Sequence, residues 1–383
     1  MRGRVEAQGI MFHAFHIEDF VPADHPLRSI KPRADAVLKA MSADFNRAYT
    51  KHGAPSIPPE RLIKALLLRA LYSIRSETQL VEQIGYNFLF RWFLDLQPTD
   101  GVWVQETFTM NRQRFEQHGL VRKFFDRVVA EALVAGLVSD DHFSVDGTLI
   151  ESYASMKSLR PIENQNQKVS DGADDDDAGN PTVNFRGERR SNKTHRSLTA
   201  AEARLARKGK GQPAKLSHSG HVLMENRHGL CLDIAVDDPN GKYERLQAAV
   251  LLERTYERHG LWPKTLGADG NYKQGAFLAA LEGDGITPHV PLPDGPIRGL
   301  ESRDAVERVS AEARRRAKRR MKTKGYAISQ RVRKRVEELI GWCKMVGGLA
   351  RAWFIGRWKI RQQSEATAAA YNLLRMARLA PAG

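Results

Sequence analysis

The spacing of apolar residues changes near residue 141, and this change constrains the fold more than any other feature of the chain. Up to about residue 135, apolar residues recur at helical spacing. The next segment, DHFSVDGTLIESYA, alternates and is rich in β-branched residues, which predicts a strand. We then expect a β-hairpin formed by AKLSHSGHVLMEN and LCLDIAV, followed by alternating helices and strands. The predicted order β-β-β-α-β-α-β-α is typical of a mixed α/β sheet flanked by helices.

The chain of 383 residues is long enough for one large or two modest domains. We predict an N-terminal arm at 1–24, a helical domain at 25–138 and an α/β domain at 139–383. The helical domain suits either a small DNA-binding module or a packing or dimerisation domain, and periodicity does not separate these two. A polar stretch near 160–195, which contains the acidic run Asp174–Asp177, is expected to be a partly disordered insertion.

The charge of the chain favours a polyanionic partner. Lys and Arg number 60 against 45 acids, which gives a net charge of +15, and nucleic acid is the commonest partner of so basic a protein. The 42% hydrophobic content excludes a disordered chain. Between residues 311 and 335 there are twelve Lys or Arg and a single acid, Glu312. This stretch leads into a predicted helix, and we expect it to follow a DNA phosphate track.

Cysteine and histidine give no sign of a metal centre, and nothing suggests a membrane. The two cysteines, Cys231 and Cys343, are too few and too far apart for a disulfide framework or a cysteine-based zinc site. His218 and His221 have a zinc-like spacing, but they lie on an alternating strand without nearby partners. No apolar run approaches the roughly 20 residues of a membrane span, and the first residues lack the apolar core of a signal peptide. A soluble, cytosolic protein is therefore expected.

Two aspartates that precede glycines lie in or at the end of predicted apolar strands. They are Asp146 in SVDGT and Asp269 in LGADGNY. A turn aspartate explains either one alone, but the pair indicates a shared site if the two strands are neighbours. Phosphoryl transfer on DNA uses two divalent ions about 3.5–4 Å apart, and such ions need hard oxygen ligands, mostly carboxylates. The pair therefore predicts a metal site.

The predicted helix SQRVRKRVEELIGWCK offers a third carboxylate. At about 100° per residue, its apolar residues gather on one face around Val336. Glu337 lies at the border of that face, in one stripe with Arg333 and Lys344, whereas Glu338 points away from the core. A metal ligand must face the sheet edge, so Glu337 is the better candidate. The alternative for Glu337 is an ion pair with Arg333, worth a few tenths of a kcal/mol.

These motifs together resemble those of the IS-five family of DDE transposases of bacterial insertion sequences. SVDGTLIESYASMKS is similar to the family's first-aspartate motif, and GADGNY to its second. ISQRVRKRVEELIGWCK resembles its C-terminal signature, Y-x2-R-x3-E-x6-K. Arg333, Glu337 and Lys344 match this signature, but Gln330 stands where the family has tyrosine, and Tyr326 lies four residues earlier. The likeness extends over nearly the whole chain.

The resemblance implies an RNase H-like catalytic domain at 139–383 and a transposase that cuts the ends of an insertion sequence and transfers the freed 3′-OH ends into target DNA. It implies two Mg²⁺ ions, for which Mn²⁺ would substitute, bound by Asp146, Asp269 and Glu337. The expected partners are double-stranded DNA with terminal inverted repeats, target DNA and a second copy of the chain, in the bacterial cytoplasm on the nucleoid. The residues expected to contact DNA are Arg333, Lys344, Arg331, Lys334, Arg335, Arg319, Arg320 and Lys322.

Two other functions fit the same residues. One is a DNA-binding protein descended from a transposase that no longer cuts. The other is an RNase H-like nuclease that uses the same carboxylates without strand transfer. The presence of Asp146, Asp269 and Glu337 argues against the first, because a protein that only binds DNA does not need all three.

Overall fold

The computed structural model describes residues 16–50, 52–53, 55–162, 181–209, 211–239 and 243–379, and the structural statements that follow concern these residues. The acidic run Asp174–Asp177 and most of the predicted N-terminal arm lie outside them. Of the arm, only a short 3-10 helix, η1 (Ile17–Phe20), is described in regular structure. Within this part of the chain, no helix is long and apolar enough to cross a membrane.

Seven helices precede the first strand in the described part of the chain. In chain order they are α1 (Pro26–Ala40), α2 (Ser42–Ala48), α3 (Pro59–Leu71), α4 (Glu77–Tyr86), α5 (Phe88–Phe93), α6 (Glu106–Gln117) and α7 (Leu120–Val134). Pro59 opens α3, where its fixed φ and missing N–H suit the first turn. The Ser76 hydroxyl accepts a hydrogen bond from the Gln79 amide and so caps α4. The helical N-terminal region is thereby confirmed.

The sheet has the predicted mixed arrangement. Its strands are β1 (His142–Glu151), β6 (Arg204–Ala206), β7 (Lys215–Glu225), β8 (Leu230–Asp237), β9 (Thr265–Gly267) and β10 (Thr287–His289). β1 is central, antiparallel to β7 and parallel to β9. The order across the sheet is β8-β7-β1-β9-β10, and β6 pairs with the far end of β7. An antiparallel meander followed by two parallel strands is the RNase H-like arrangement, so the predicted fold class is confirmed.

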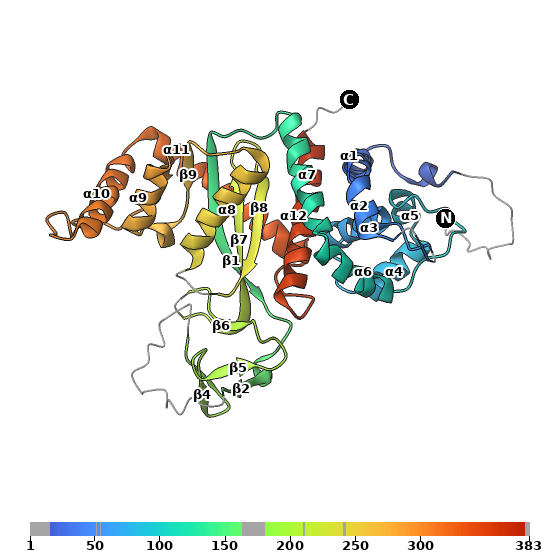
Figure 1. Ribbon diagram of the computed structural model, residues 1–383, viewed down its shortest axis with the longest axis horizontal. Coiled ribbons are helices and arrows are strands. Elements are labelled where there is room, and N and C mark those ends of the chain that lie inside the picture. Colours follow the sequence, from blue (N-terminus) through green and yellow to red (C-terminus); the bar gives the residue numbers. More distant parts are fainter. Residues whose placement is uncertain are drawn as a thin grey trace, which may run out of the picture.

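The segment between β1 and β7 contains strands that the sequence pattern did not reveal. β2 (Leu159–Pro161) pairs with β5 (His195–Ser197), and β3 (Val183–Phe185) pairs with β4 (Glu188–Arg190). These strands project below the main sheet in Figure 1. The described flanks of the predicted insertion therefore have regular structure, although each strand has only three residues.

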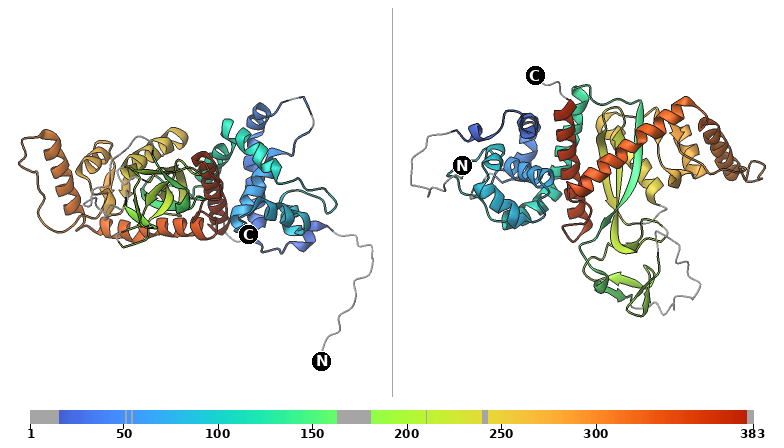
Figure 2. Two further views of the ribbon diagram at one scale, coloured as in Figure 1. Left: turned by 90° about the horizontal axis from the view of Figure 1, so that it is seen from below. Right: turned by 180° about the vertical axis from the view of Figure 1, so that it is seen from behind.

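Helices cover both faces of the sheet. α8 (Tyr243–His259) packs on β7 and β8, whereas α11 (Lys324–Met345) packs on β1, β7, β9 and β10. The two helices lie on opposite faces in both views of Figure 2. α9 (Gly275–Gly283) and α10 (Ala305–Arg320) pack together beyond β10. β1, which carries Asp146, is therefore packed against α11, which carries Glu337.

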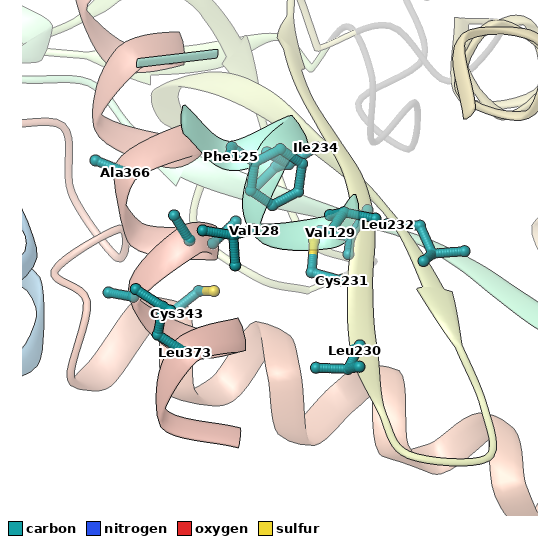
Figure 3. Packing of buried hydrophobic residues seen from close by; sticks show 14 of the residues in the cluster. Phe125, Val128, Val129, Leu230, Cys231, Leu232, Ile234, Cys343, Ala366 and Leu373 are labelled. Carbon is teal, nitrogen blue, oxygen red and sulfur yellow. The ribbon is translucent and has the colours of Figure 1, made fainter. Parts of the chain in front are cut away.

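The last helix, α12 (Arg357–Leu379), joins the helical region to the sheet. It packs against α1, α3 and α7 on one side and against β8 on the other. Side chains of α7, β8, α11 and α12 meet in one hydrophobic cluster, which includes Phe125, Cys231, Cys343 and Leu373 (Figure 3). The Asn372 amide also bonds both backbone groups of Cys231. The predicted division at residue 138 thus separates segments that share one core.

Gly275 sets the distance between α9 and α10, which leads to a prediction about stability. A Cβ at Gly275 would lie 2.2 Å from the carbonyl oxygen of Ser310, so one helix must shift. Such overpacking typically costs about 1–3 kcal/mol. We expect Gly275→Ala to lower the free energy of unfolding by about that amount in chemical denaturation. Gly283→Ala is the matched control, because nothing lies within 4 Å of its added Cβ. Equal stability of the two variants would contradict the packing described.

Candidate active site

The register of β1 and β9 brings the two predicted aspartates together. The last paired residues are Ser144 and Gly267. Asp146 and Asp269 lie two residues beyond this pair on their respective segments. Equivalent positions on two adjacent parallel strands lie at the same level of the sheet. In keeping with this shared level, the negative charge of Asp269 acts on the carboxyl group of Asp146. The predicted convergence of the two strands is therefore present.

The Asp146 carboxyl group is in an unfavourable place for a negative charge. Burial, and then the charge of Asp269, raise its pKa to about 6. The backbone N–H of Gly147 donates to Asp146 Oδ1 at 2.8 Å, and this bond and the Arg333 charge only partly offset the shift. Asp269 Oδ1 accepts from the backbone N–H of Asn271 at 2.9 Å and caps the short helix η3 (Gly270–Tyr272). The site thus carries an excess of negative charge that a cation would offset.

Glu337 approaches the same site from α11. Gly267 lets this helix lie close to the sheet, because a Cβ there would lie 3.3 Å from Ser329 Oγ. Arg333 lies between the two acids: its Nη1 is 3.8 Å from Asp146 Oδ2 and its Nη2 is 3.3 Å from Glu337 Oε1. The Glu337 side chain is 59% exposed, so it is open to a ligand from solution.

Glu338 points elsewhere. Burial above all raises the pKa of Tyr371 to about 12, and the charge of Glu338 adds to this shift. Glu338 is exposed and its charge acts on Tyr371 of α12, where the Trp342 ring packs with ring centroids 5.4 Å apart. Of the two adjacent glutamates, the structure places Glu337 beside Asp146.

The donor set fits a hard divalent cation. Carboxylate oxygens are the ligands that Mg²⁺ prefers, and Asp146 and Asp269 already lie together. Glu337 is hydrogen-bonded to Arg333, so its carboxylate would leave that guanidinium to join the pair. As the described side chains stand, no three acidic, histidine or cysteine groups surround a common point.

Gln330 and Tyr326 hold α11 against the sheet edge. The Nε2 of Gln330 donates to the carbonyl oxygen of His289 at 2.7 Å, which ties α11 to β10. Tyr326 lies edge-on to the His289 ring, with ring centroids 5.9 Å apart. Burial raises the pKa of Tyr326, and the charge of Arg333 opposes this shift. Tyrosine is thus present beside the site, although its position in the sequence is shifted.

The predicted DNA-contacting cations fall into two groups. Arg331, Lys334, Arg319 and Lys322 are exposed. In contrast, Arg335 Nη1 donates to the carbonyl oxygens of Asn226 and Arg227 at 2.6 and 2.7 Å, and Arg320 pairs with Glu282 at 2.5 Å. Arg335 and Arg320 therefore also hold the fold together, and their contact with DNA stays a prediction. Lys344 is half-buried, and burial and the charge of Lys208 lower its pKa.

Two polar residues beside the site, Glu244 and Tyr272, were missed from the sequence, and His221 was considered only for a zinc site. Glu244 lies in the first turn of α8. Acidic residues are common there because they interact favourably with the helix dipole, so its presence in the sequence did not indicate a functional role. His221 and Tyr272 are each 1% exposed. His218 and His221, considered for their zinc-like spacing, are three residues apart on β7 and so point to opposite faces. They cannot bind one ion together.

Two family profiles match the chain. One, described as a transposase domain (DUF772), matches residues 15–114, and the other, described as a transposase DDE domain, matches residues 183–373. Together the two matches span most of the chain, and the protein belongs to the DDE transposases. No curated protein shows a significant sequence match.

Two solved structures show a distant likeness. The Mos1 transposase paired-end complex with the left transposon end is 12% identical, with 79% of this chain and 84% of that chain covered and a TM-score of 0.19. The Mos1 strand transfer complex is 14% identical, with 82% and 84% covered and a TM-score of 0.20. The strand order, and not this likeness, defines the fold.

Proposed function

We propose that this transposase belongs to the IS-five family and that it cuts the ends of an insertion sequence and joins the freed 3′-OH ends to target DNA. Asp146, Asp269 and Glu337 would bind two Mg²⁺ ions, and Mn²⁺ would substitute. The observation that carries this proposal is the placement of the two aspartates at one level of adjacent parallel strands, with Arg333 between Asp146 and Glu337.

The chemistry divides between the ions and the chain. Bound divalent ions would activate an oxygen nucleophile and stabilise the charge that develops at the scissile phosphate. Asp146 would hold an ion from β1, Asp269 from just beyond the end of β9, and Glu337 from α11. Once Glu337 turns away from it, the Arg333 guanidinium is free to hold a phosphate oxygen. Water first hydrolyses the phosphodiester at the end of the element, and the freed 3′-OH then attacks the target strand by in-line displacement, without a covalent enzyme intermediate.

The exposed cations would hold the DNA along one side of this site. Arg331 and Lys334 on α11, together with Arg319 and Lys322 near the end of α10, are placed to contact phosphates that flank the scissile bond. Lys344 and Lys208 would extend this contact toward the segment that contains β2–β6. Because both ends of an element must be joined, a homodimer on paired ends is the proposed working form, acting on the bacterial nucleoid, with residues 25–138 as its DNA-binding or dimerisation domain.

One assay tests the proposal against its two rivals. Purified protein is incubated with Mg²⁺ or Mn²⁺ and a labelled duplex that carries the inverted repeats flanking the gene. We expect metal-dependent cleavage at the repeat ends and joining to a target duplex. Cleavage without joining on any target would indicate a nuclease. Tight binding without metal-dependent cleavage would exclude both enzymatic functions and leave a DNA-binding protein.

A further inference from the structure

Gly147, the residue after Asp146, faces the opposite side of the sheet from α11. Successive strand residues point to opposite faces, so Asp146 faces Arg333 on α11 and Gly147 faces α8. A Cβ at Gly147 would lie 3.3 Å from Glu244 Oε1 and 3.7 Å from His221 Nδ1. The missing side chain therefore lets a glutamate and a histidine converge over β1, directly beside the Asp146 backbone.

Glu244 lies within electrostatic reach of both catalytic aspartates. Burial raises the pKa of Glu244, and the charges of Asp269 and then Asp146 raise it further, while Arg245 opposes the shift. Arg245 itself donates to the carbonyl oxygen of Asn271 rather than to Glu244. Among the described residues, no side chain forms an ion pair with the Glu244 carboxylate. The charges of Asp146 and Asp269 therefore act on Glu244 across β1, and Arg245 offsets them only in part.

Two buried polar side chains beside Glu244 also lack partners. Both ring nitrogens of His221 and the hydroxyl of Tyr272 have no hydrogen-bond partner among the described residues, and each residue is 1% exposed. His221 lies directly opposite Gly147 on β7, so its ring is on the same face as Glu244. Burial raises the pKa of Tyr272, and the nearby charges of Glu244, Asp146 and Asp269 add to that shift. Buried polar groups are normally hydrogen-bonded, so this cluster is suited to a hydrated ligand.

We propose that Glu244 is a fourth carboxylate of the metal site and reaches the Asp146–Asp269 pair from the α8 face, opposite Glu337. His221 and Tyr272 are positioning residues, and the water that accompanies a bound ion would satisfy their unpaired polar atoms. This inference rests on the proposed function and adds a ligand from a helix that the sequence motifs do not include. It also explains why glycine follows Asp146, since a larger side chain would displace the Glu244 carboxylate.

The test measures metal binding on the full chain without DNA. Mn²⁺ is titrated calorimetrically into the wild type, Glu244→Gln and Glu253→Gln. Glu253 is exposed on the same helix and serves as the matched control. We expect Glu244→Gln to weaken Mn²⁺ binding by about tenfold or more, since even groups that only support metal ligands cost about 10–100-fold. Glu253→Gln is expected to bind as the wild type does.

A second readout separates metal binding from a structural role. Without metal, removal of the Glu244 charge relieves repulsion among three carboxylates, so the Tm of Glu244→Gln should equal or exceed that of the wild type. With Mn²⁺ the order should reverse, because the wild type gains more from binding. A purely structural glutamate would lower the Tm in both conditions. If the glutamine variant does not fold, Glu244→Asp, which keeps the charge on a shorter side chain, tests the reach of the ligand: its gain in Tm on addition of Mn²⁺ should be smaller than that of the wild type.

The outcomes separate this inference from the proposed function. If the wild type binds Mn²⁺ and cleaves DNA, and Glu244→Gln matches it in both, Glu244 is not a ligand and the proposed function stands. If the wild type neither binds Mn²⁺ nor cleaves, the proposed function fails and the inference fails with it. A tenfold loss of Mn²⁺ binding that is confined to Glu244→Gln supports both.

Discussion

Asp146→Asn is expected to abolish DNA cleavage and to leave DNA binding close to the wild-type level. The amide keeps the size of the side chain and can still accept from the Gly147 N–H, but a neutral oxygen is a poor ligand for a divalent ion. Changes to groups that only support metal ligands cost about 10–100-fold, so loss of a direct ligand should cost more than about 100-fold. Single-turnover cleavage of an end duplex measures this effect.

DNA binding provides the control for Asp146→Asn. The exposed cations proposed to hold phosphates, such as Arg331 and Lys334, do not depend on this carboxyl group. A gel-shift titration should therefore give the wild-type affinity. A variant that cleaves within a few-fold of the wild type would remove Asp146 from the proposed metal site, and one that no longer binds DNA would indicate a folding defect.

Glu337→Gln is expected to lose most cleavage activity, whereas Glu338→Gln should keep it. The two residues are adjacent and chemically identical, so each is the matched control of the other. Arg333 links Glu337 to Asp146, and the charge of Glu337 acts on the Asp146 carboxyl group, whereas the charge of Glu338 acts on Tyr371 of α12. The same single-turnover assay compares them. Activity in Glu337→Gln together with inactivity in Glu338→Gln would show that the opposite helix face holds the metal.

Much of this site could be predicted because local pattern and register determine it. The alternation in SVDGTLIES predicts a strand through Asp146, and the apolar run before Asp269 predicts a second strand. Helical geometry alone separates Glu337 from Glu338, because a rotation of about 100° moves a side chain from the border of the apolar face to its far side. The structure has the predicted order of strands and helices around β1.

The rest depends on contacts between distant segments. Glu244 reaches the site only because α8 packs on β7 and β8 and Gly147 leaves space beneath it. Arg335 looks like an exposed DNA-binding cation in the sequence, but the carbonyl groups of the β7–β8 turn bind it. The strands β2–β5 have three residues each, which is too few for an alternation of apolar and polar residues to be recognised in the sequence. In each case a tertiary neighbour, rather than local sequence, decides the outcome.

Metal rescue of Asp146→Cys tests most directly whether this carboxyl group binds the ion that cuts DNA. A thiolate is a poor ligand for Mg²⁺ and a better one for softer divalent metals. The variant, confirmed to be folded and to bind DNA, is assayed for end cleavage in Mg²⁺ and then in Mn²⁺, beside Asp146→Ala. We expect no cleavage of Asp146→Cys in Mg²⁺, measurable recovery in Mn²⁺, and none for Asp146→Ala in either metal. Cleavage by Asp146→Cys that is equal in the two metals and close to wild-type would contradict a metal-binding role for Asp146.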